Sequence, residues 1–324
     1  MPFTSTRRQA LLAAAGIALP RLAWAGDTWP SRPVRLIVPF PAGGPMDMVA
    51  RLVAPLASEA IGAPVIVDNR SGGTGTIAII ETARAAPDGH TLMITGSSWP
   101  VVPLLNPGVP FHMSDFAPLS RLTVAPLIFA VPGSLPVSSL GEFIEEARKR
   151  PGQWSYATSG IGSTLHLSTE MIKRRAGIDL VHVPYRGNGP AMTDLLAGRV
   201  QTMFPTIMDA LPFLREGRLK ALAVGYRERV EWLPEVPTLA EAGFGDVPAS
   251  SDFGLACPAA VPAPIRDRLG DAFRNGARQP QIRQRLHDAG ILVVATGAAE
   301  FTSLVADEGA RFAEVIRTAN ISLN

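Results

Sequence analysis

The sequence predicts an α/β protein whose parallel strands are covered by helices on both faces. Short apolar runs alternate along the chain with longer amphipathic stretches, which is the rhythm of βαβ units. The runs are nearly continuous in Val, Ile and Leu rather than alternating with polar residues, as expected for strands buried on both faces. Because 324 residues exceed the usual size of one hydrophobic core, we expect two lobes.

The predicted strands are the apolar runs, which in chain order are Val34–Val38, Val65–Val67, Thr91–Thr95, Leu127–Val131, Leu180–Val183, Lys220–Val224 and Ile291–Val294. Gly and Pro stand at nearly every junction between these runs and the amphipathic stretches. We find no internal repeat and, after the N-terminal segment, no stretch approaching the ~20 apolar residues of a membrane span. The pattern is that of an ordinary α/β globular chain.

The N-terminal segment has the organisation of a cleavable export signal. Arg7 and Arg8 precede an uncharged stretch that runs from Gln9 to Pro20, and Ala23-Trp24-Ala25 supplies the small-x-small pattern that a signal peptidase requires. The apolar stretch is about ten residues long, half of what a bilayer-spanning helix needs. We therefore predict a leader over residues 1–25 and a periplasmic mature protein, with both the twin-arginine and the ordinary secretory route open.

Removal of the leader changes the charge of the protein. Arg7, Arg8 and Arg21 leave without any acid, so the 30 basic residues fall to 27 against 28 acidic ones. A net charge of about −1 without a long basic run argues against nucleic acid as a partner. The single cysteine, Cys257, excludes a disulfide framework and a lipid-modified N-terminal cysteine. We expect a soluble exported protein.

The loop after the first strand has the composition of an anion-binding site. It reads Pro39-Phe40-Pro41-Ala42-Gly43-Gly44-Pro45-Met46-Asp47 and leads into a helical pattern. The glycine pair lets bare backbone approach a ligand, and the N–H groups at the positive end of the helix favour a carboxylate. Asp47 is expected to cap the helix or its neighbours; the alternative is that the loop is a simple tight turn. Pro55 should bend or end the helix.

Three further loops are small, hydroxylic and flexible. They are Asp68–Thr76, which contains Gly73; Gly96–Trp99, which contains Ser97 and Ser98; and Thr158–Thr164, which contains Ser159, Gly162 and Ser163 and opens a helix expected to stop at Gly177. Such loops at the carboxyl ends of parallel strands are where open α/β sheets bind small molecules. Hydroxyls at helix N-termini are also common structural caps, and that alternative stays open.

Catalytic motifs are absent from the sequence. It lacks a Gly-x-Ser-x-Gly elbow, a phosphate-binding loop, a His-Glu-x-x-His helix and any Cys/His metal spacing. Ser163 and His166 stand three residues apart and could form a nucleophile and base, with Asp194 or Asp209 as orienting acid. His166 could equally hydrogen-bond a ligand or the helix start. We predict a non-enzymatic protein without metal or cofactor, and keep a serine-dependent hydrolase as the alternative.

An ordered series of motifs resembles one family over nearly the whole mature chain, the tripartite tricarboxylate transporter receptors, also called the Bug family of periplasmic solute-binding proteins. The motifs are Ile37–Gly44 with Asp47 and Ala50–Leu52; Val67–Arg70; Ala86–Leu92; Ser159–Ser163 with His166-Leu167; Val181–Gly187; and Leu222–Val224 ahead of Val236–Thr238.

The resemblance implies a type II periplasmic-binding fold of two lobes with mainly parallel sheets flanked by helices and a hinge of two crossing segments. From the rhythm of the strands we place the two crossings near Ala125–Val131 and Ser250–Ala256, so that residues 26–127 and 252–324 form one lobe and 128–251 the other. A small organic acid would be held in the cleft by the Gly43-Gly44, Ser97-Ser98 and Thr158–Ser163 loops. The receptor, expected to be a monomer, would close by its hinge and dock on membrane permease subunits; a sensor without a transport role is a further alternative.

Two positions depart from the family pattern. Met203-Phe204-Pro205-Thr206 stands where members commonly have Phe-Asp-Asn, which makes an amino-acid ligand less expected. Asp252 stands where members usually have Trp ahead of Phe253-Gly254-Leu255, and it could pair with a ligand donor, pair with Arg186 or face solvent. An unpaired Asp252 in the cleft would repel a second ligand carboxylate and favour a monocarboxylate or a hydroxylated acid.

The candidate ligand-binding residues are therefore Ala42, Gly43, Gly44, Pro45, Asp47, Gly73, Ser97, Ser98, Thr158, Ser159, Gly162, Ser163, His166, Tyr185, Thr206 and Asp252.

Overall fold

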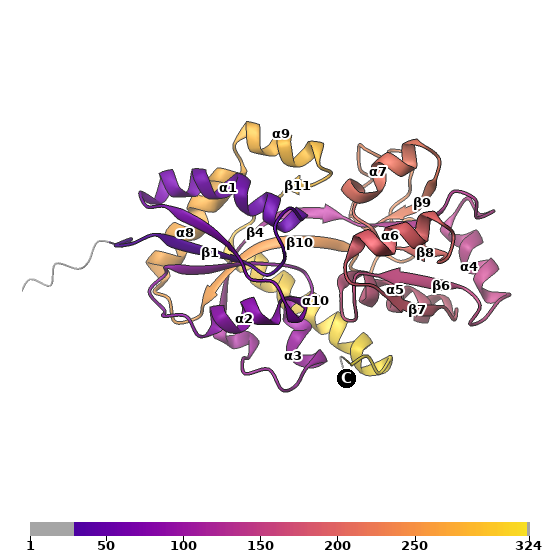
Figure 1. Cartoon of the computed structure of the whole chain (residues 1–324), viewed down its shortest axis with the longest axis horizontal. Helices are drawn as coiled ribbons and strands as arrows, with labels where there is room; N and C mark the ends of the chain where they lie inside the picture. The colour runs from indigo at the N-terminus through magenta and orange to yellow at the C-terminus, as the bar shows by residue number, and fades with distance from the viewer. Residues whose placement is uncertain (1–28, 323–324) are drawn as a thin grey trace, which may run out of the picture.

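Two lobes lie side by side along the long axis of the molecule, each built on its own β-sheet (Figure 1). The computed structural model describes residues 29–322, so the predicted leader over residues 1–25 lies outside the described residues. Helices alternate with strands through both lobes, which confirms the predicted α/β class. We call the six-stranded sheet with its helices the first lobe, and the five-stranded sheet with its helices the second lobe.

The sheet of the first lobe has the strand order β11-β4-β10-β3-β1-β2. The strand β1 pairs in parallel with β2 and β3, whereas β10 runs antiparallel to both β3 and β4, and β11 runs antiparallel to β4. The strands of this sheet are β1 Val34–Val38, β2 Val65–Asn69, β3 Thr91–Thr95, β4 Phe116–Pro126, β10 Ser250–Pro258 and β11 Leu292–Val293.

The sheet of the second lobe has the order β7-β6-β8-β5-β9. The strand β6 pairs in parallel with β7 and β8, and β5 pairs antiparallel with β8 and β9. The strands are β5 Ile128–Pro132, β6 Ser155–Thr158, β7 Val181–Pro184, β8 Thr202–Met203 and β9 Leu219–Val224. Both sheets are thus mixed, and each antiparallel pair involves β4, β5 or β10, the strands on either side of a passage between the lobes.

The chain changes sheet between Pro126, which ends β4, and Ile128, which begins β5. It returns at Ser250, where β10 begins and pairs with Pro126 of β4. Two adjacent antiparallel segments therefore connect the lobes, an arrangement that permits hinge bending. The exact lobe boundaries given above stay a prediction.

Helices cover both faces of the first sheet. Apolar side chains of α1, α8 and α9 pack on one face, and those of α2, α10 and the segment around Trp99 pack on the other. The helices of the protein are α1 Pro45–Ile61, α2 Thr76–Ala83, α3 Val102–Leu105, α4 Leu140–Arg148, α5 Thr164–Ala176, α6 Asn188–Leu196, α7 Ile207–Arg215, α8 Ala263–Ala277, α9 Pro280–Asp288 and α10 Ala298–Thr318. Short 3₁₀ helices span Gly73–Gly75, Trp99–Val101 and Met113–Asp115.

A bend at Pro55 stays a prediction, but the helix α1 does not end there. It continues to Ile61 and stops at Gly62, which adopts the left-handed conformation with φ 79°. Proline removes one helical hydrogen bond, but the apolar face of the helix is buried on both sides of it, at Val53 and Ala57. That burial outweighs the lost bond. The predicted stop at Gly177 is confirmed, with φ 61°.

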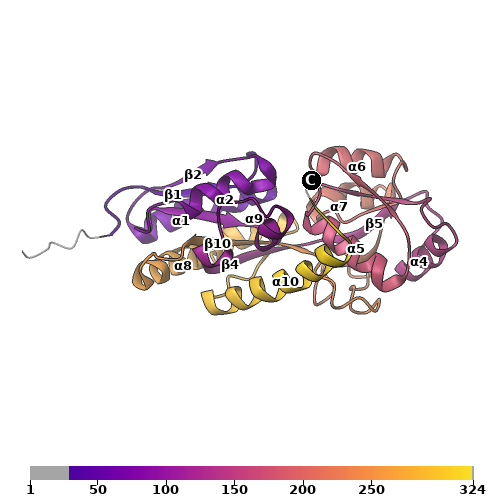
Figure 2. The same ribbon diagram turned by 90° about the horizontal axis from the view of Figure 1, so that it is seen from below.

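The C-terminal helix α10 joins the two lobes. It starts beneath the first sheet and reaches α5 of the second lobe (Figure 2). Phe312 and Ile316 of α10 pack in a small apolar cluster with Leu105 of α3 and Leu167 of α5. The lobes are therefore in contact at this cluster as well as at the two passages of the chain.

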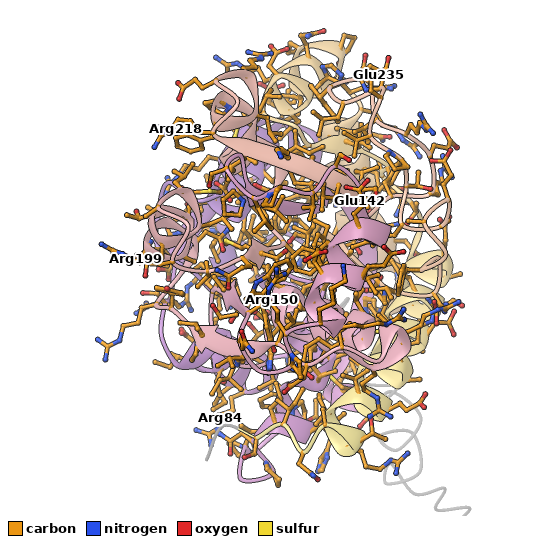
Figure 3. The ribbon with its side chains drawn as sticks, turned by 90° about the vertical axis from the view of Figure 1, so that its right-hand side faces the viewer. Arg84, Glu142, Arg150, Arg199, Arg218 and Glu235 are labelled. Carbon is orange, nitrogen blue, oxygen red and sulfur yellow. The ribbon has the colours of Figure 1, made fainter. Side chains whose placement is uncertain are left out.

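Charged side chains of both signs cover the outer end of the second lobe. Arg150, Arg199 and Arg218 are spread over this end, together with Glu142 and Glu235 (Figure 3). Several of these arginines are already neutralised, for example Arg199 by Asp194. Within residues 29–322, no helix has both the length and the apolar character needed to cross a bilayer.

Candidate functional site

The candidate loops lie at the carboxyl edges of the parallel strands in both lobes. In the first lobe β1, β2 and β3 end at Val38, Asn69 and Thr95, and each is followed by one of the predicted loops. In the second lobe β6, β7 and β8 end at the same edge of their sheet, and α5, α6 and α7 begin there. This is the edge at which open α/β sheets bind ligands.

The loop between β1 and α1 presents uncapped backbone. Gly43 has φ 90°, which favours glycine, and a Cβ there would meet nothing within 4 Å. Gly44 is the N-cap of α1, no side chain caps this end, and Pro45 occupies the first turn. The N–H groups of the first turn are thus available to an anion. Ala42 and Gly43 are exposed, and Gly44 and Pro45 are half-buried.

Asp47 holds this loop in place. Its carboxylate accepts a hydrogen bond from the Gly43 N–H at 2.9 Å, a second from Arg51 Nε at 2.9 Å and a third from Asn69 Nδ2 at 2.9 Å. Burial alone would raise the pKa of Asp47, but these hydrogen bonds, led by that of Arg51, hold its pKa below the usual value. The side chain is nearly buried and fully engaged, so it positions the loop rather than contacting a ligand anion.

The other first-lobe loops converge on the same edge. Phe40, Gly75 and Ser98 line one small cavity together, and a Cβ on Gly75 would come within 3.3 Å of Pro39. Gly73, exposed, opens the short 3₁₀ helix that leads to Gly75. The hydroxyl of Ser98 makes no hydrogen bond to any described residue, so it can serve a ligand.

Ser97 differs from its neighbour because its hydroxyl is occupied. Ser97 Oγ donates to the carbonyl oxygen of Ser250 at 3.0 Å and accepts the Asp252 N–H at 2.8 Å. The side chain is buried and ties the end of β3 to the start of β10. Ser97 therefore links a candidate loop to the passage between the lobes.

In the second lobe the Thr158–Ser163 loop is fastened by its own hydrogen bonds. Ser163 caps α5, accepting the His166 N–H at 3.3 Å and donating to the Gly160 carbonyl at 2.8 Å. Thr158 Oγ1 lies 2.7 Å from His182 Nε2 and bonds Gly160 as well. The loop is also joined to the next one, because the Tyr185 N–H donates to the Thr158 carbonyl and the Gly187 N–H to that of Ser159.

Residues at the neighbouring strand ends surround this loop. The hydroxyl of Tyr185 donates to Asp194 at 2.6 Å, and Thr206 Oγ1 caps α7 by accepting the Asp209 N–H at 3.2 Å. Asn188 Nδ2 donates to Asp209 at 2.9 Å, whereas its Oδ1 is buried without a partner among the described residues. The N-termini of α5, α6 and α7 thus add positive backbone ends to this side of the site.

The two halves of the site meet at Gly162. A Cβ on Gly162 would lie 2.1 Å from Cδ1 of Leu105, so the second-lobe loop packs directly on α3 of the first lobe. The φ of Gly162 is 76°, which also favours glycine. The Thr158–Ser163 loop therefore contacts the first lobe at α3, the helix that follows the Ser98 loop in the chain.

His166 supports the second-lobe loop and has no geometry for catalysis. Its Nδ1 accepts the Gly162 N–H at 3.0 Å, and its ring stacks on that of His182 at 4.0 Å. Burial, with smaller contributions from His182 and Lys173, lowers the pKa of His166 to about 3. Ser163 Oγ donates to a carbonyl rather than to this ring, and Asp194 and Asp209 have other partners. The serine-hydrolase alternative therefore finds no proton relay here.

The structure contradicts two of the expectations for Asp252, pairing with Arg186 and exposure to solvent. The side chain is 3% exposed and accepts hydrogen bonds from Arg121 Nη2 at 2.5 Å and Nε at 3.1 Å. The reason is that β4 and β10 are antiparallel neighbours, which the sequence did not indicate. Since Asp252 is neutralised, the argument that it would repel a second ligand carboxylate loses its basis.

Arg121, Asn188 and His182 were not among the predicted site residues. The sequence gives one weak indication that Arg121 has a specific role, because it is a lone charge inside a largely apolar segment. The other two lie in motifs of unremarkable composition and become apparent only through their contacts. Among the described residues no three His, Cys, Asp or Glu side chains gather closely enough to hold a metal ion.

Comparisons with known proteins point to a single family. Residues 49–321 match the family described as Tripartite tricarboxylate transporter family receptor. Protein BugT of Bordetella pertussis is 34% identical over 96% of this chain and 96% of its own length.

Two solved structures are similar throughout. MatC of Rhodopseudomonas palustris with bound malate is 33% identical, with a TM-score of 0.77 over 89% of this chain and 100% of that chain. An R. palustris protein with adipate is 34% identical, with a TM-score of 0.78 over 91% of this chain and 99% of that chain. Family match, relatives and fold agree: the chain belongs to the tripartite tricarboxylate transporter receptors, a family of periplasmic solute-binding proteins.

Proposed function

We propose that the protein captures a small organic carboxylate between its two lobes and delivers it to a tripartite tricarboxylate-type membrane permease. The observation that carries this proposal is the N-terminus of α1. It has no side-chain cap, Gly43 beside it leaves the backbone bare, and the nearby Asp47 is already engaged. A carboxylate is the natural occupant of such a helix end.

Both lobes would contribute contacts to the ligand. In the first lobe the N–H groups of Ala42 and Gly44 and the hydroxyl of Ser98 would contact the anion. In the second lobe the N–H groups of Ser159 and Ile161 would do so, with Tyr185 and Thr206 at neighbouring strand ends. A ligand that contacts both lobes favours the closed state by its differential affinity, and bending at the two passages of the chain would permit the closure.

The ligand class includes dicarboxylic acids. Malate and adipate, the molecules named with two similar structures, each carry two carboxylates. Because Arg121 pairs with Asp252, this acid does not oppose the second carboxylate. We extend the class to hydroxylated and unsubstituted dicarboxylic acids of about this size, while the absence of an acid at Thr206 argues against an ammonium-bearing ligand there.

The role is non-enzymatic. Ser163 and His166, the two residues that could suggest a nucleophile and base, are committed to the cap of α5 and to the Gly162 N–H. Binding and release with closure of the lobes account for the arrangement without a chemical step.

A thermal-shift panel on ligand-stripped residues 26–324 tests whether the protein binds a carboxylate. The panel contains malate, adipate, citrate and glutamate, with the diamide of malic acid as the uncharged match. Ligand at about 100 times its dissociation constant stabilises by about 2.7 kcal/mol, a readable shift. We expect a carboxylate to raise the melting temperature and the diamide to leave it unchanged. The proposal is wrong if no acid shifts the melt.

Uptake measurements test the delivery part. Deletion of the gene should abolish uptake of the acid identified in the panel, and re-expression should restore it. Unchanged uptake in the deletion strain would remove the transport role while leaving carboxylate binding intact, as expected for a sensor.

A further inference from the structure

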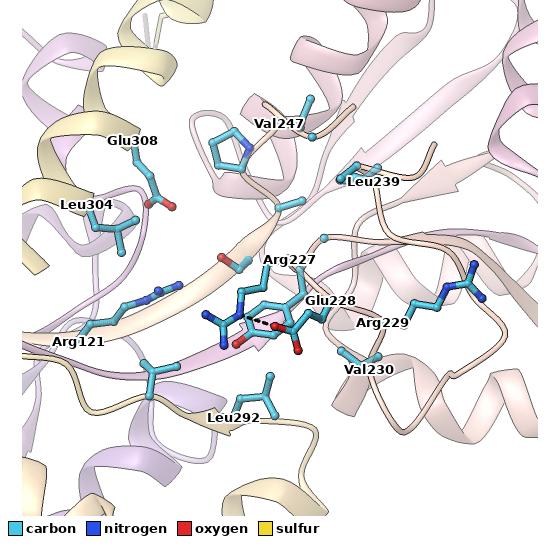
Figure 4. Close-up of a pocket in the computed structure, with 18 of the residues that line it drawn as sticks. Arg121, Arg227, Glu228, Arg229, Val230, Leu239, Val247, Leu292, Leu304 and Glu308 are labelled. Carbon is cyan, nitrogen blue, oxygen red and sulfur yellow. Dashed lines mark ion pairs between the residues drawn. The ribbon is translucent and has the colours of Figure 1, made fainter. Parts of the chain in front are cut away.

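A second cavity lies beside the strands that connect the lobes, apart from the candidate carboxylate loops. It has a volume of about 840 Å³ and is lined by β4, β11 and α10 of the first lobe and by residues 225–250 (Figure 4). None of the sixteen candidate ligand-binding residues lines it. The volume falls within the range of sites for small organic molecules, ~300–1,000 Å³.

The wall formed by α10 carries unpaired acids. Glu300, Asp307 and Glu308 line the cavity and make no hydrogen bond or ion pair through their carboxylates with any described residue. Arg311, on the same wall, is also unpaired among the described residues. This wall alone thus has three acids against one base.

The arginines that face this wall are already neutralised. Arg121 pairs with Asp252, and two further lining arginines, Arg227 and Arg229, pair with Glu228 and Glu241. Figure 4 shows the Arg227–Glu228 pair across the cavity from Glu308. The cavity therefore has an excess of negative charge on its α10 side, which favours a cationic occupant.

Glu308 is the buried acid of that wall. The residue is 9% exposed, and its side chain points from α10 into the cavity, next to Leu304 (Figure 4). The charged groups around it are Asp252 on β10, Arg121 on β4 and Arg311 on α10; burial and then Asp252 raise the pKa of Glu308 to about 8. A buried carboxyl without a partner is costly unless it meets a proton or a cation.

The remaining lining is apolar and aromatic. Tyr226, Trp232 and Phe244 contribute rings, and Val247, Leu292 and Leu304 contribute aliphatic surface. These groups suit the apolar body of an organic ligand, whereas the rings of Tyr226 and Phe244 already meet Arg227 and Arg175. A bare metal ion does not fit, because within residues 29–322 no cluster of acids or histidines converges on one point.

From these observations we propose that the cavity is a second binding site, which takes a small organic amine with an apolar body and places its ammonium group against Glu308. The cavity lining shares no residue with the candidate ligand-binding set, and the ligand carries the opposite charge. Glu308 also lines a small neighbouring cavity together with Ser97 and Asp252. It draws its lining from both lobes, so its occupant lies across the passages of the chain.

Isothermal titration with three matched probes tests this site. 2-Phenylethylamine, 2-phenylethanol and phenylacetate share one body and differ in charge. We expect the amine to bind and the alcohol and acid to bind about tenfold more weakly or not at all. Titrations of the amine in buffers of different ionisation enthalpy should reveal proton release from Glu308 as the ammonium takes its place.

Two variants on α10 sharpen the test. Glu308→Gln keeps the shape of the side chain and should weaken amine binding about tenfold or more and abolish the proton release. Glu314→Gln removes an exposed acid of the same helix outside the cavity and should leave both unchanged. Three results would overturn the proposal. They are no binding of the amine at about 10 mM, equal binding of the alcohol, and binding of the amine that Glu308→Gln does not change. The carboxylate panel on the same preparations reports folding and keeps this outcome separate from that of the first site.

Discussion

The carboxylate of Asp252 accepts hydrogen bonds from Nη2 and Nε of Arg121, at 2.5 and 3.1 Å, between the adjacent strands β10 and β4. Asp252 also accepts a contact from Ser97, whose hydroxyl receives the Asp252 N–H. The pair thus connects β4, β10 and the loop that follows β3, close to both passages of the chain. Arg121 faces the second cavity, whereas Ser97 belongs to a candidate carboxylate loop.

Removal of Arg121 alone should destabilise the protein strongly. Arg121→Leu leaves the Asp252 charge buried without its partner, which costs about 3–5 kcal/mol in comparable cases. The double variant Arg121→Leu/Asp252→Leu removes both charges and should recover most of this loss. Urea denaturation of the two variants and the wild type measures the effect. Equal stability of the single and double variants would show that the pair is not the reason for the loss.

Asp47 should stabilise the protein at neutral pH and lose that effect in acid. Since its folded pKa lies below the usual 3.8, the contribution is complete above that value and disappears as pH falls through the folded pKa. Asp47→Asn should cost about 1–3 kcal/mol at pH 7. The difference from wild type, followed by urea denaturation between pH 7 and 3, should shrink in acid. A difference that stays constant over this range would contradict the ionised role.

Ser163 should act as a helix cap rather than as a nucleophile. Ser163→Ala is expected to lose about 1 kcal/mol of stability, and Ser139→Ala, which removes the matching cap of α4, should lose a similar amount. Only the Ser163 variant should weaken carboxylate binding, because only its loop belongs to the site. Neither variant should change the rate of p-nitrophenyl acetate hydrolysis; a loss specific to Ser163→Ala would restore the hydrolase alternative.

Glu308 should make stability fall as pH rises. Its folded pKa is about 8 and its ordinary value 4.5, so between these values the folded state holds a proton that the unfolded state has released. Stability therefore decreases through this window, by up to about 1.4 kcal/mol for each pH unit. Glu308→Gln cannot ionise and should exceed the wild type in stability at pH 9 while matching it near pH 4.

The comparison with Glu314→Gln isolates that effect. The control changes the same charge on an exposed part of α10 and should follow the wild-type pH profile. Parallel profiles for the Glu308→Gln variant and the wild type would mean that the carboxyl is not held protonated in the folded protein.

The parallel strands were predictable because their residues reveal them locally. Val34–Val38 and Thr91–Thr95 form strands over the expected bounds, since each is a continuous run of residues suited to a buried strand. The strand β4 was not predicted, because Pro118, Ser120 and Arg121 interrupt its apolar pattern. The two-residue strand β8 is too short for any periodicity to indicate.

The contacts within the site were less predictable than its loops. Glycines and hydroxyls at strand ends indicated the candidate loops, because their chemistry is local. The pairing of Asp252 with Arg121, and the stacking of His166 on His182, depend on strand order and register between distant segments. A single sequence carries no local signal for either, and the same is true of the cavity that Glu308 faces.

Carboxylate titration of paired glycine variants tests the central claim most directly. Gly43→Ala and Gly62→Ala each force a side chain into left-handed backbone, φ 90° and 79°, at opposite ends of α1, and neither new Cβ meets an atom within 4 Å. Their cost in stability should therefore be similar. Calorimetry with the acid identified in the thermal-shift panel should show that Gly43→Ala binds it at least about tenfold more weakly than the wild type does. Gly62→Ala should bind it with wild-type affinity. Equal affinities for the two variants would contradict binding of the carboxylate at the start of α1.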